Sequence, residues 1–188
     1  TVREEQFTLR NREGLNIPLQ TEIAARWPDG SVKWSRHTAC AESMGEGGEL
    51  LPAENRMLPE GLTVRESREA FQVTGTEFEI TVPKGGTALA GECRKAGQQA
   101  FRAVSPVLLL AHEKETSTGI RRETVKCPAK ILETVCESAG PLEVVFRVDG
   151  VHLEEGAEKM PFRIRMSLHP DGVIDFDDTF FFRGNPET

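Results

Sequence analysis

The tripeptide Pro-Asp-Gly occurs twice in this 188-residue sequence, at residues 28–30 and again at residues 170–172. Proline presets the backbone angle of the first central position of a type I turn, aspartate suits the second, and glycine takes the left-handed conformation that follows. Each tripeptide therefore predicts a β-hairpin. The first hairpin joins Ile23–Trp27 to Ser31–Thr38, and the second joins Phe162–Leu168 to Val173–Phe182.

The second hairpin allows its register to be predicted. A type I turn with a glycine bulge places His169 opposite Val173. The pairs on one face are then Leu168–Ile174, Met166–Phe176, Ile164–Asp178 and Phe162–Phe180, and those on the other are Ser167–Asp175, Arg165–Asp177 and Arg163–Thr179. Apolar and charged side chains separate as a one-sided sheet requires, and only Asp178 breaks the pattern. The same rule pairs Glu22 with Arg36, Ala24 with Trp34 and Arg26 with Val32 in the first hairpin.

The rest of the chain alternates between apolar and polar residues with the period of a half-buried strand. The continuously apolar end of Phe101–Leu110 predicts a strand buried on both faces or at a sheet centre. Prolines separate three further candidates, which are Arg121–Lys126, Ala129–Glu137 and Leu142–Val151. Residues 41–61 are polar and glycine-rich and predict a mobile loop or a crossover. The predicted fold class is all-β, an antiparallel hairpin-built barrel or sandwich with little helix.

Composition limits the classes of function. The formal net charge of −7 repels polyanions, so we expect no nucleic-acid partner and no attraction to an anionic membrane surface. No apolar stretch approaches the length of a membrane span. The four cysteines lack the paired spacing of a metal site and are expected to be free thiols. The cellular compartment stays open between cytoplasmic and secreted.

The length predicts a single β domain over residues 1–188, or two β subunits of about 1–60 and 61–188 that share a core. The chain begins without methionine, and a strongly apolar strand is expected only a few residues before its end. We therefore expect it to be a piece of a longer protein.

Four residues around the first hairpin are candidates for contact with a sugar: Trp27, Trp34, Arg36 and His37. An indole face can cover the apolar face of a pyranose, although aromatic rings are more often used in cores, and we expect one or both of these tryptophans to be core residues. Lys33, Arg36 and His37 are close enough in sequence to form a cationic corner for a uronate, but basic residues on strands are usually solvated.

The sequence predicts no cofactor, no metal and no catalytic residue. Asp175 and Asp177 share a strand face and carry oxygen ligands of the kind that calcium takes, but Arg165 is the expected partner of Asp177. The four histidines are scattered, and the absence of tyrosine removes one common catalytic group.

Several segments resemble the N-terminal β domain of the exo-acting rhamnogalacturonan lyases and their bacterial relatives. The distinctive segment is Trp27-Pro28-Asp29-Gly30-Ser31-Val32-Lys33-Trp34, which follows Pro18-Leu19-Gln20. Less specific segments continue the resemblance in order: residues 137–142 with Arg147 and Gly150, residues 160–165, and residues 179–182. In that family a β domain described as a RIFT-type barrel precedes an α/α toroid that holds the catalytic residues.

The resemblance implies that this chain is a non-catalytic accessory domain that packs on and supports a downstream catalytic domain of the same polypeptide. It also implies an acidic plant polysaccharide as the substrate of the whole enzyme. Two other functions stay open: an independent carbohydrate-binding or protein-interaction module, and a self-contained lyase. An exposed apolar patch beside the C-terminus would favour the accessory domain, and an exposed tryptophan in a groove would favour the independent module.

Overall fold

A computed structural model describes residues 7–40, 47–52 and 60–181. The described residues form antiparallel strands and contain no helix, which confirms the predicted all-β class. The described part of the chain accordingly has no helix of the length and apolarity needed to cross a membrane. The four cysteines are free thiols, and Cys40 is exposed.

Strands β1 to β5 form the N-terminal module, and strands β6 to β15 form two five-stranded sheets. The module consists of β1 (Phe7–Asn11), β2 (Asn16–Ile17), β3 (Leu19–Arg26), β4 (Val32–Ala39) and β5 (Gly48–Pro52). The small sheet consists of β6 (Thr63–Glu66), β7 (Ala70–Thr74), β8 (Phe78–Pro83), β9 (Cys93–Lys95) and β10 (Gln98–Phe101). The large sheet consists of β11 (Val107–Thr116), β12 (Gly119–Ala139), β13 (Val144–Glu154), β14 (Ala157–Leu168) and β15 (Ile174–Phe180).

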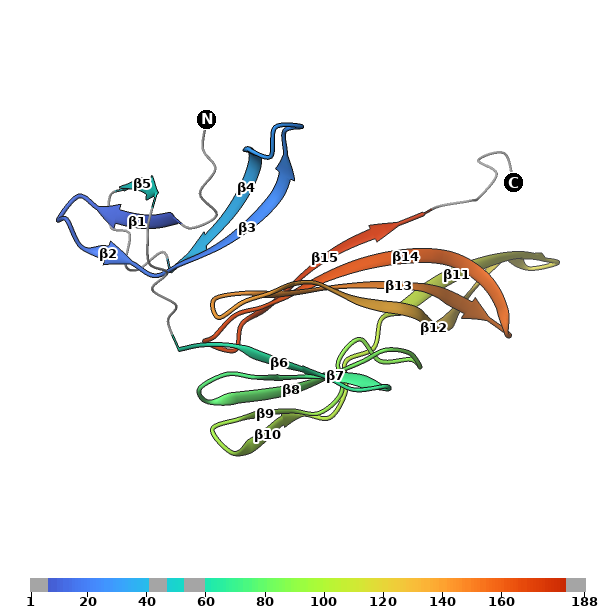
Figure 1. Cartoon of the computed structure of the whole chain (residues 1–188). Coiled ribbons are helices and arrows are strands. Elements are labelled where there is room, and N and C mark those ends of the chain that lie inside the picture. Colours follow the sequence, from blue (N-terminus) through green and yellow to red (C-terminus); the bar gives the residue numbers. More distant parts are fainter. Residues whose placement is uncertain (1–6, 41–46, 53–59, 182–188) are drawn as a thin grey trace.

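The two five-stranded sheets pack face to face as a sandwich (Figure 1). Alternate residues of facing strands fill the space between them, and Phe71 meets Phe146 there with ring centroids 5.1 Å apart. A second cluster lies further along the large sheet, where Leu89 covers Phe162 and Ile164. The large sheet extends past the small sheet at the end where β11 and β12 project (Figure 1).

The N-terminal module has a small core of its own. Strands β2, β1 and β5 form a three-stranded sheet, β3 and β4 form a separate two-stranded sheet, and Leu9, Ile17 and Leu19 are buried between them. The prediction of a mobile loop or a crossover over residues 41–61 is wrong for Gly48–Pro52, because these residues form β5 and pair with β1. Its remaining parts, residues 41–46 and 53–59, lie outside the described residues.

Both Pro-Asp-Gly turns have the predicted geometry. Gly30 has a φ angle of +81° and Gly172 one of +82°. A backbone hydrogen bond closes each loop: the Trp27 amide donates to the Ser31 carbonyl, and the His169 amide donates to the Val173 carbonyl. Every predicted pair of the second hairpin is confirmed. In the first hairpin Trp34 lies opposite Ala25 instead of Ala24, because the register shifts between Arg26 and Ala25. A second shift between Ala25 and Ile23 restores the predicted pair of Glu22 with Arg36.

Two strand predictions are wrong. The segment that ends in Leu110 belongs to β11, which is the edge strand of the large sheet and leaves Val107 and Leu109 exposed. The predicted break at Pro128 does not occur, since β12 runs from Gly119 to Ala139. Pro128 fits because β12 changes its partner there: residues up to Pro128 pair with β11, and those from Ala129 pair with β13.

Candidate functional site

The first hairpin carries all four candidate sugar contacts and stands as an isolated two-stranded sheet. Its turn is held locally, because Asp29 Oδ1 accepts hydrogen bonds from the amide and the hydroxyl of Ser31. These two bonds hold the pKa of Asp29 below its usual value. The turn therefore fixes how the two flanking tryptophans leave the backbone.

Both tryptophans are exposed, so the prediction that one or both are core residues is wrong. Trp27 keeps 52% of its surface and Trp34 keeps 65%. Within the described ranges no further strand pairs with β3 or β4, and the hairpin stands as a two-stranded sheet. The Lys33 ammonium lies 4.4 Å from the centroid of the Trp27 ring, so a cation occupies one face of that indole. Trp34 is the more accessible ring for a ligand.

The candidate cations do not converge on one side of the hairpin. Alternate strand residues point to opposite faces, so Arg36 shares a face with Trp34 and Thr38, whereas His37 faces the other way. The His37 ring lies against Phe7 of the N-terminal module, with centroids 5.1 Å apart. The structure thus separates Arg36 from His37, and contact of either residue with a sugar stays a prediction.

The two ring nitrogens of His37 are both engaged by hydroxyl groups. Thr21 Oγ1 lies 3.0 Å from Nδ1, and Ser35 Oγ lies 2.8 Å from Nε2. Burial lowers the pKa of His37 below its usual value, which favours the neutral ring at physiological pH. Both ring nitrogens of His37 therefore have hydroxyl partners from the hairpin itself.

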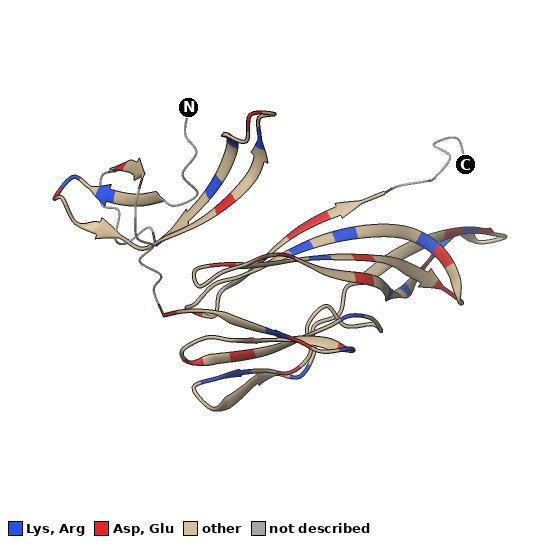
Figure 2. Ribbon diagram, viewed as in Figure 1, with Lys and Arg blue, Asp and Glu red and all other residues tan. Residues whose placement is uncertain are grey.

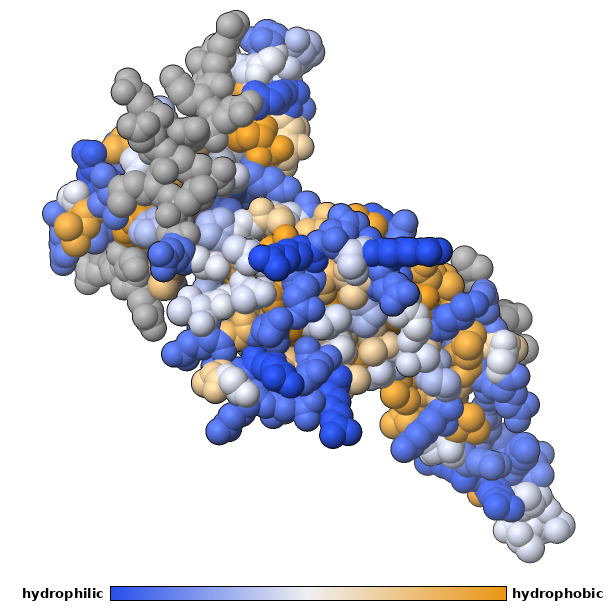
Figure 3. Space-filling view, turned by 60° about the horizontal axis from the view of Figure 1, so that its bottom comes forward, coloured by the Kyte–Doolittle hydropathy of each residue, from blue (hydrophilic) through white to orange (hydrophobic). Residues whose placement is uncertain are grey.

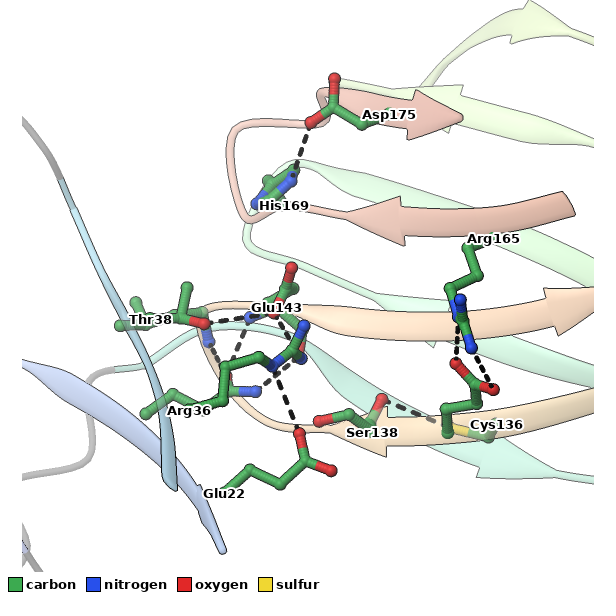
Figure 4. A network of polar contacts seen from close by, with 12 residues as sticks. Glu22, Arg36, Thr38, Cys136, Ser138, Glu143, Arg165, His169 and Asp175 are labelled. Atoms are coloured by element: carbon green, nitrogen blue, oxygen red, sulfur yellow. Dashed lines mark hydrogen bonds and ion pairs between the residues drawn. The ribbon is translucent and has the colours of Figure 1, made fainter. Parts of the chain in front are cut away.

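Arg36 lies at the junction between the N-terminal module and the sandwich. Its Nη2 atom is 2.8 Å from Oε2 of Glu143, which also accepts a hydrogen bond of 3.1 Å from the Thr38 hydroxyl. Arg36 Nε is 3.4 Å from a carboxylate oxygen of Glu22 (Figure 4). Glu143 is largely buried, so this ion pair is less screened than one at the surface.

Gln20 completes the junction from β3. Its side-chain amide donates to the carbonyl of Glu143, and its oxygen accepts from the amides of Leu142 and Glu143, all at 2.9 Å. A Cβ atom on Gly140 would lie 2.3 Å from the Gln20 amide carbon, so glycine is needed for this approach. We call the set Gln20, Arg36, Thr38 and Glu143 the Glu143 junction. Figure 4 shows Arg36 and Thr38 of this set close to Glu143.

A groove of about 530 Å³ opens beside the Glu143 junction. It has a mixed lining, with polar groups such as the Thr38 hydroxyl and the His169 ring beside the apolar Leu142 and Val173. His169 Nε2 is 3.1 Å from Oδ2 of Asp175, so this histidine is paired with a carboxylate (Figure 4). A groove of this size has the volume of a small-ligand site.

The other two histidines are far from the hairpin in sequence and lie on the large sheet. His112 and Lys159 both pair with Glu154. The hydrogen bond with Lys159, which has the larger effect, and the one with His112 hold the pKa of Glu154 below its usual value. His152 is 3% exposed and packs on the Phe162 ring, with centroids 4.8 Å apart. Burial lowers the pKa of His152, and its Nδ1 atom has no hydrogen-bond partner among the described residues.

Basic and acidic residues occur along the strands of the large sheet (Figure 2). Arg147 pairs with Glu133 and Asp149, each at 2.9 Å, and Arg163 pairs with Asp149 at 2.7 Å. Arg165, the predicted partner of Asp177, lies opposite it in the ladder but makes its ion pair with Glu137 at 2.8 Å. These side chains form a network of internal ion pairs, so the guanidinium groups are already neutralised.

Two family models match the chain in order. The PcRGLX-like N-terminal RIFT barrel domain matches residues 1–51, and the PcRGLX-like protein central beta sandwich domain matches residues 62–188. The chain belongs to the PcRGLX-like family. This confirms the resemblance to the β domain of rhamnogalacturonan lyases, with the barrel model on the N-terminal module and the sandwich model on the two packed sheets.

A curated relative of this PcRGLX-like chain is the "Uncharacterized protein YetA" of Bacillus subtilis (strain 168). The two are 25% identical over 170 residues, which cover 88% of this chain and 20% of the relative. The chain thus spans about a fifth of the length of the curated relative that it matches.

Sequence reasoning missed the role of Glu143 and Gln20. The signal was present, because Gln20 ends one of the segments that carry the resemblance and Leu142 ends another. In the structure these two PcRGLX-like segments meet through the hydrogen bond from the Leu142 amide to Gln20. Contact between segments 122 residues apart cannot be read from strand alternation.

Proposed function

We propose that this chain is the non-catalytic N-terminal accessory region of a rhamnogalacturonan-lyase-like polysaccharide-degrading enzyme. In this proposal it packs on a downstream catalytic domain of the same polypeptide and supports it. Membership in the PcRGLX-like family and the match to only about a fifth of the length of YetA both support this assignment. The acidic plant polysaccharide is the proposed substrate of the whole enzyme and is not assigned to a site on this chain.

The observation that carries the proposal is the internal pairing of the groups that a lyase would need. Eliminative cleavage of a uronic-acid polymer requires a cation beside the substrate carboxylate and a base that takes the proton next to it. Arg36 is paired with Glu22 and Glu143, and His37 is held by two hydroxyl groups. On the large sheet Arg147, Arg163 and Arg165 are likewise paired with carboxylates. In this proposal these groups serve the fold and not a substrate.

The alternative, an independent carbohydrate-binding module, is supported by one observation. Trp34 is 65% exposed on an isolated hairpin, and an exposed indole is a suitable platform for the apolar face of a sugar ring. Trp27 has similar exposure but carries Lys33 over its ring, so Trp27 is a matched control for a test of Trp34.

Activity assays on rhamnogalacturonan distinguish the two functions. We expect the isolated chain to release no unsaturated products and the natural full-length polypeptide to release them. In calorimetric titrations of the isolated chain with rhamnogalacturonan fragments, we expect Trp34→Ala and Trp27→Ala to behave alike. Product release by the isolated chain would contradict the accessory role. Saturable binding that Trp34→Ala weakens and Trp27→Ala does not would establish the binding module instead.

A further inference from the structure

The inner face of β15 is left uncovered by the sandwich. Ladder register places Phe176, Asp178 and Phe180 on the same side of the large sheet as Met166, Ile164 and Phe162. Those three β14 partners are at most 3% exposed, whereas Phe176 keeps 47% of its surface and Phe180 keeps 54%. We call Phe176, Asp178 and Phe180 the β15 strip. The buried part of this face therefore ends at β14 and does not extend to β15.

The small sheet does not reach the β15 strip. The buried cluster that joins the two sheets includes Phe146, Met166 and Leu168 of β13 and β14, but from β15 only Ile174 packs against it. Figure 3 shows hydrophobic side chains gathered between the body of the sandwich and the polar arm that projects from it. Two half-exposed phenylalanines on one strand form a patch of the kind that marks an interaction surface.

β15 is also an edge strand. It pairs with β14 on one side and ends the strand order of the large sheet. An exposed edge with large apolar residues is prone to pair with another chain, and proteins usually protect it with lysine, proline or a covering segment. The residues of β15 include no lysine and no proline, although Asp175, Asp177 and the inward-facing Asp178 place charges on this edge. The uncovered inner face of β15, with its two half-exposed phenylalanines, is therefore the main indication of a missing neighbour.

We propose that the β15 strip is the surface on which the polypeptide that follows this chain docks. This inference rests on the proposed function and names the surface through which the accessory role is exerted. β15 is the last strand of the described chain, so a polypeptide that continues from it emerges beside the strip (Figure 1). The matched segment is 20% of the length of YetA, so most of that relative lies outside the match and is large enough to cover such a surface.

Asp178 defines what the docked surface must offer. Its carboxylate lies between the two phenylalanines of the strip, and partial burial already raises its pKa above the usual value. Covering it with an apolar surface alone would leave a desolvated charge, which is costly. The docked surface therefore supplies apolar side chains for Phe176 and Phe180, and an N–H donor or a cation opposite Asp178. Such a partner accounts for Asp178, the only residue that breaks the apolar face predicted from the sequence.

Amide hydrogen exchange in the natural full-length polypeptide tests the inference. We expect the β15 amides to exchange at least about tenfold more slowly there than in the isolated chain. Phe180→Asp should abolish this protection. Leu132→Asp is the matched control, because Leu132 on β12 of the same sheet is similarly exposed, at 56% against 54% for Phe180, and it should leave the protection unchanged.

Thermal unfolding of the isolated chain shows whether the variants fold. Both should unfold like the parent chain, because both sites are exposed in it. Equal exchange of the β15 amides in the two forms, or equal effects of the two substitutions on the full-length protein, would overturn the inference. So would a concentration-dependent dimer that Phe180→Asp dissolves, or a natural polypeptide that ends at Thr188. Protection of β15 in a full-length protein without lyase activity would overturn the proposed function and leave the docking surface standing.

Discussion

Gln20→Ala is expected to loosen the N-terminal module from the sandwich. Gln20 is 5% exposed and satisfies the amides of Leu142 and Glu143 and the carbonyl of Glu143. A buried polar group left without a partner costs about 1–3 kcal/mol, and this substitution frees three of them. Water that enters the space will recover part of this cost. The remaining links of the Glu143 junction are those of Glu143 to Arg36 and Thr38.

The measurement is the exchange rate of the Leu142 and Glu143 amides, together with the midpoint of denaturant unfolding. Both amides should exchange faster in Gln20→Ala, and the midpoint should fall. Gln72→Ala is the control, since Gln72 also makes two side-chain hydrogen bonds but only to Glu79 and Thr81 on the face of the small sheet. If the two variants were equally stable, with unchanged amide exchange at the turn, Gln20 would not hold the two parts together.

Gly150→Ala is expected to destabilise the sandwich more than any surface substitution. A Cβ atom at position 150 would lie 2.3 Å from Cζ of Phe162 and 2.8 Å from the carbonyl oxygen of Lys130. The Phe162 ring is 1% exposed and packs against His152, so it has little room to move. Overpacking of this kind costs about 1–3 kcal/mol, and sometimes more where backbone must also shift.

Denaturant unfolding of the isolated chain measures this cost. Gly85→Ala is the control, because a Cβ atom there meets nothing within 4 Å. It should change the free energy of unfolding by less than about 0.5 kcal/mol. Combining Gly150→Ala with Phe162→Leu should cost less than the sum of the two single substitutions, since the smaller side chain makes room for the methyl group. Additive costs would show that Phe162 does not lie over Gly150.

Local turn chemistry made the second hairpin predictable residue by residue. The Pro-Asp-Gly turn fixed the loop length, and the loop length fixed the register of every pair from Leu168 to Phe162. The first hairpin has the same turn, but a register shift between Ala25 and Arg26 moved Trp34 by one position. The turn residues give no signal for such a shift.

Burial was less predictable than strand pairing, because it depends on which surfaces the fold covers. The apolar run that ends in Leu110 was expected at a sheet centre, yet β11 is an edge strand. One or both tryptophans were expected in the core, yet both are exposed on a hairpin that stands as a two-stranded sheet. Phe180 likewise belongs to an apolar strand but is left half-exposed by the described fold. The Glu143 junction was missed because it joins residues far apart in sequence.

The central claim is that this chain supports a catalytic domain and performs no chemistry of its own. The most direct test adds the isolated chain to the rest of the natural polypeptide, expressed without it, and follows unfolding temperature and rhamnogalacturonan cleavage together. The account predicts that the wild-type chain raises the unfolding temperature in a saturable way and restores cleavage, and that the Phe180→Asp chain does neither. An unfolding temperature and a cleavage rate that do not respond to the added wild-type chain would contradict it.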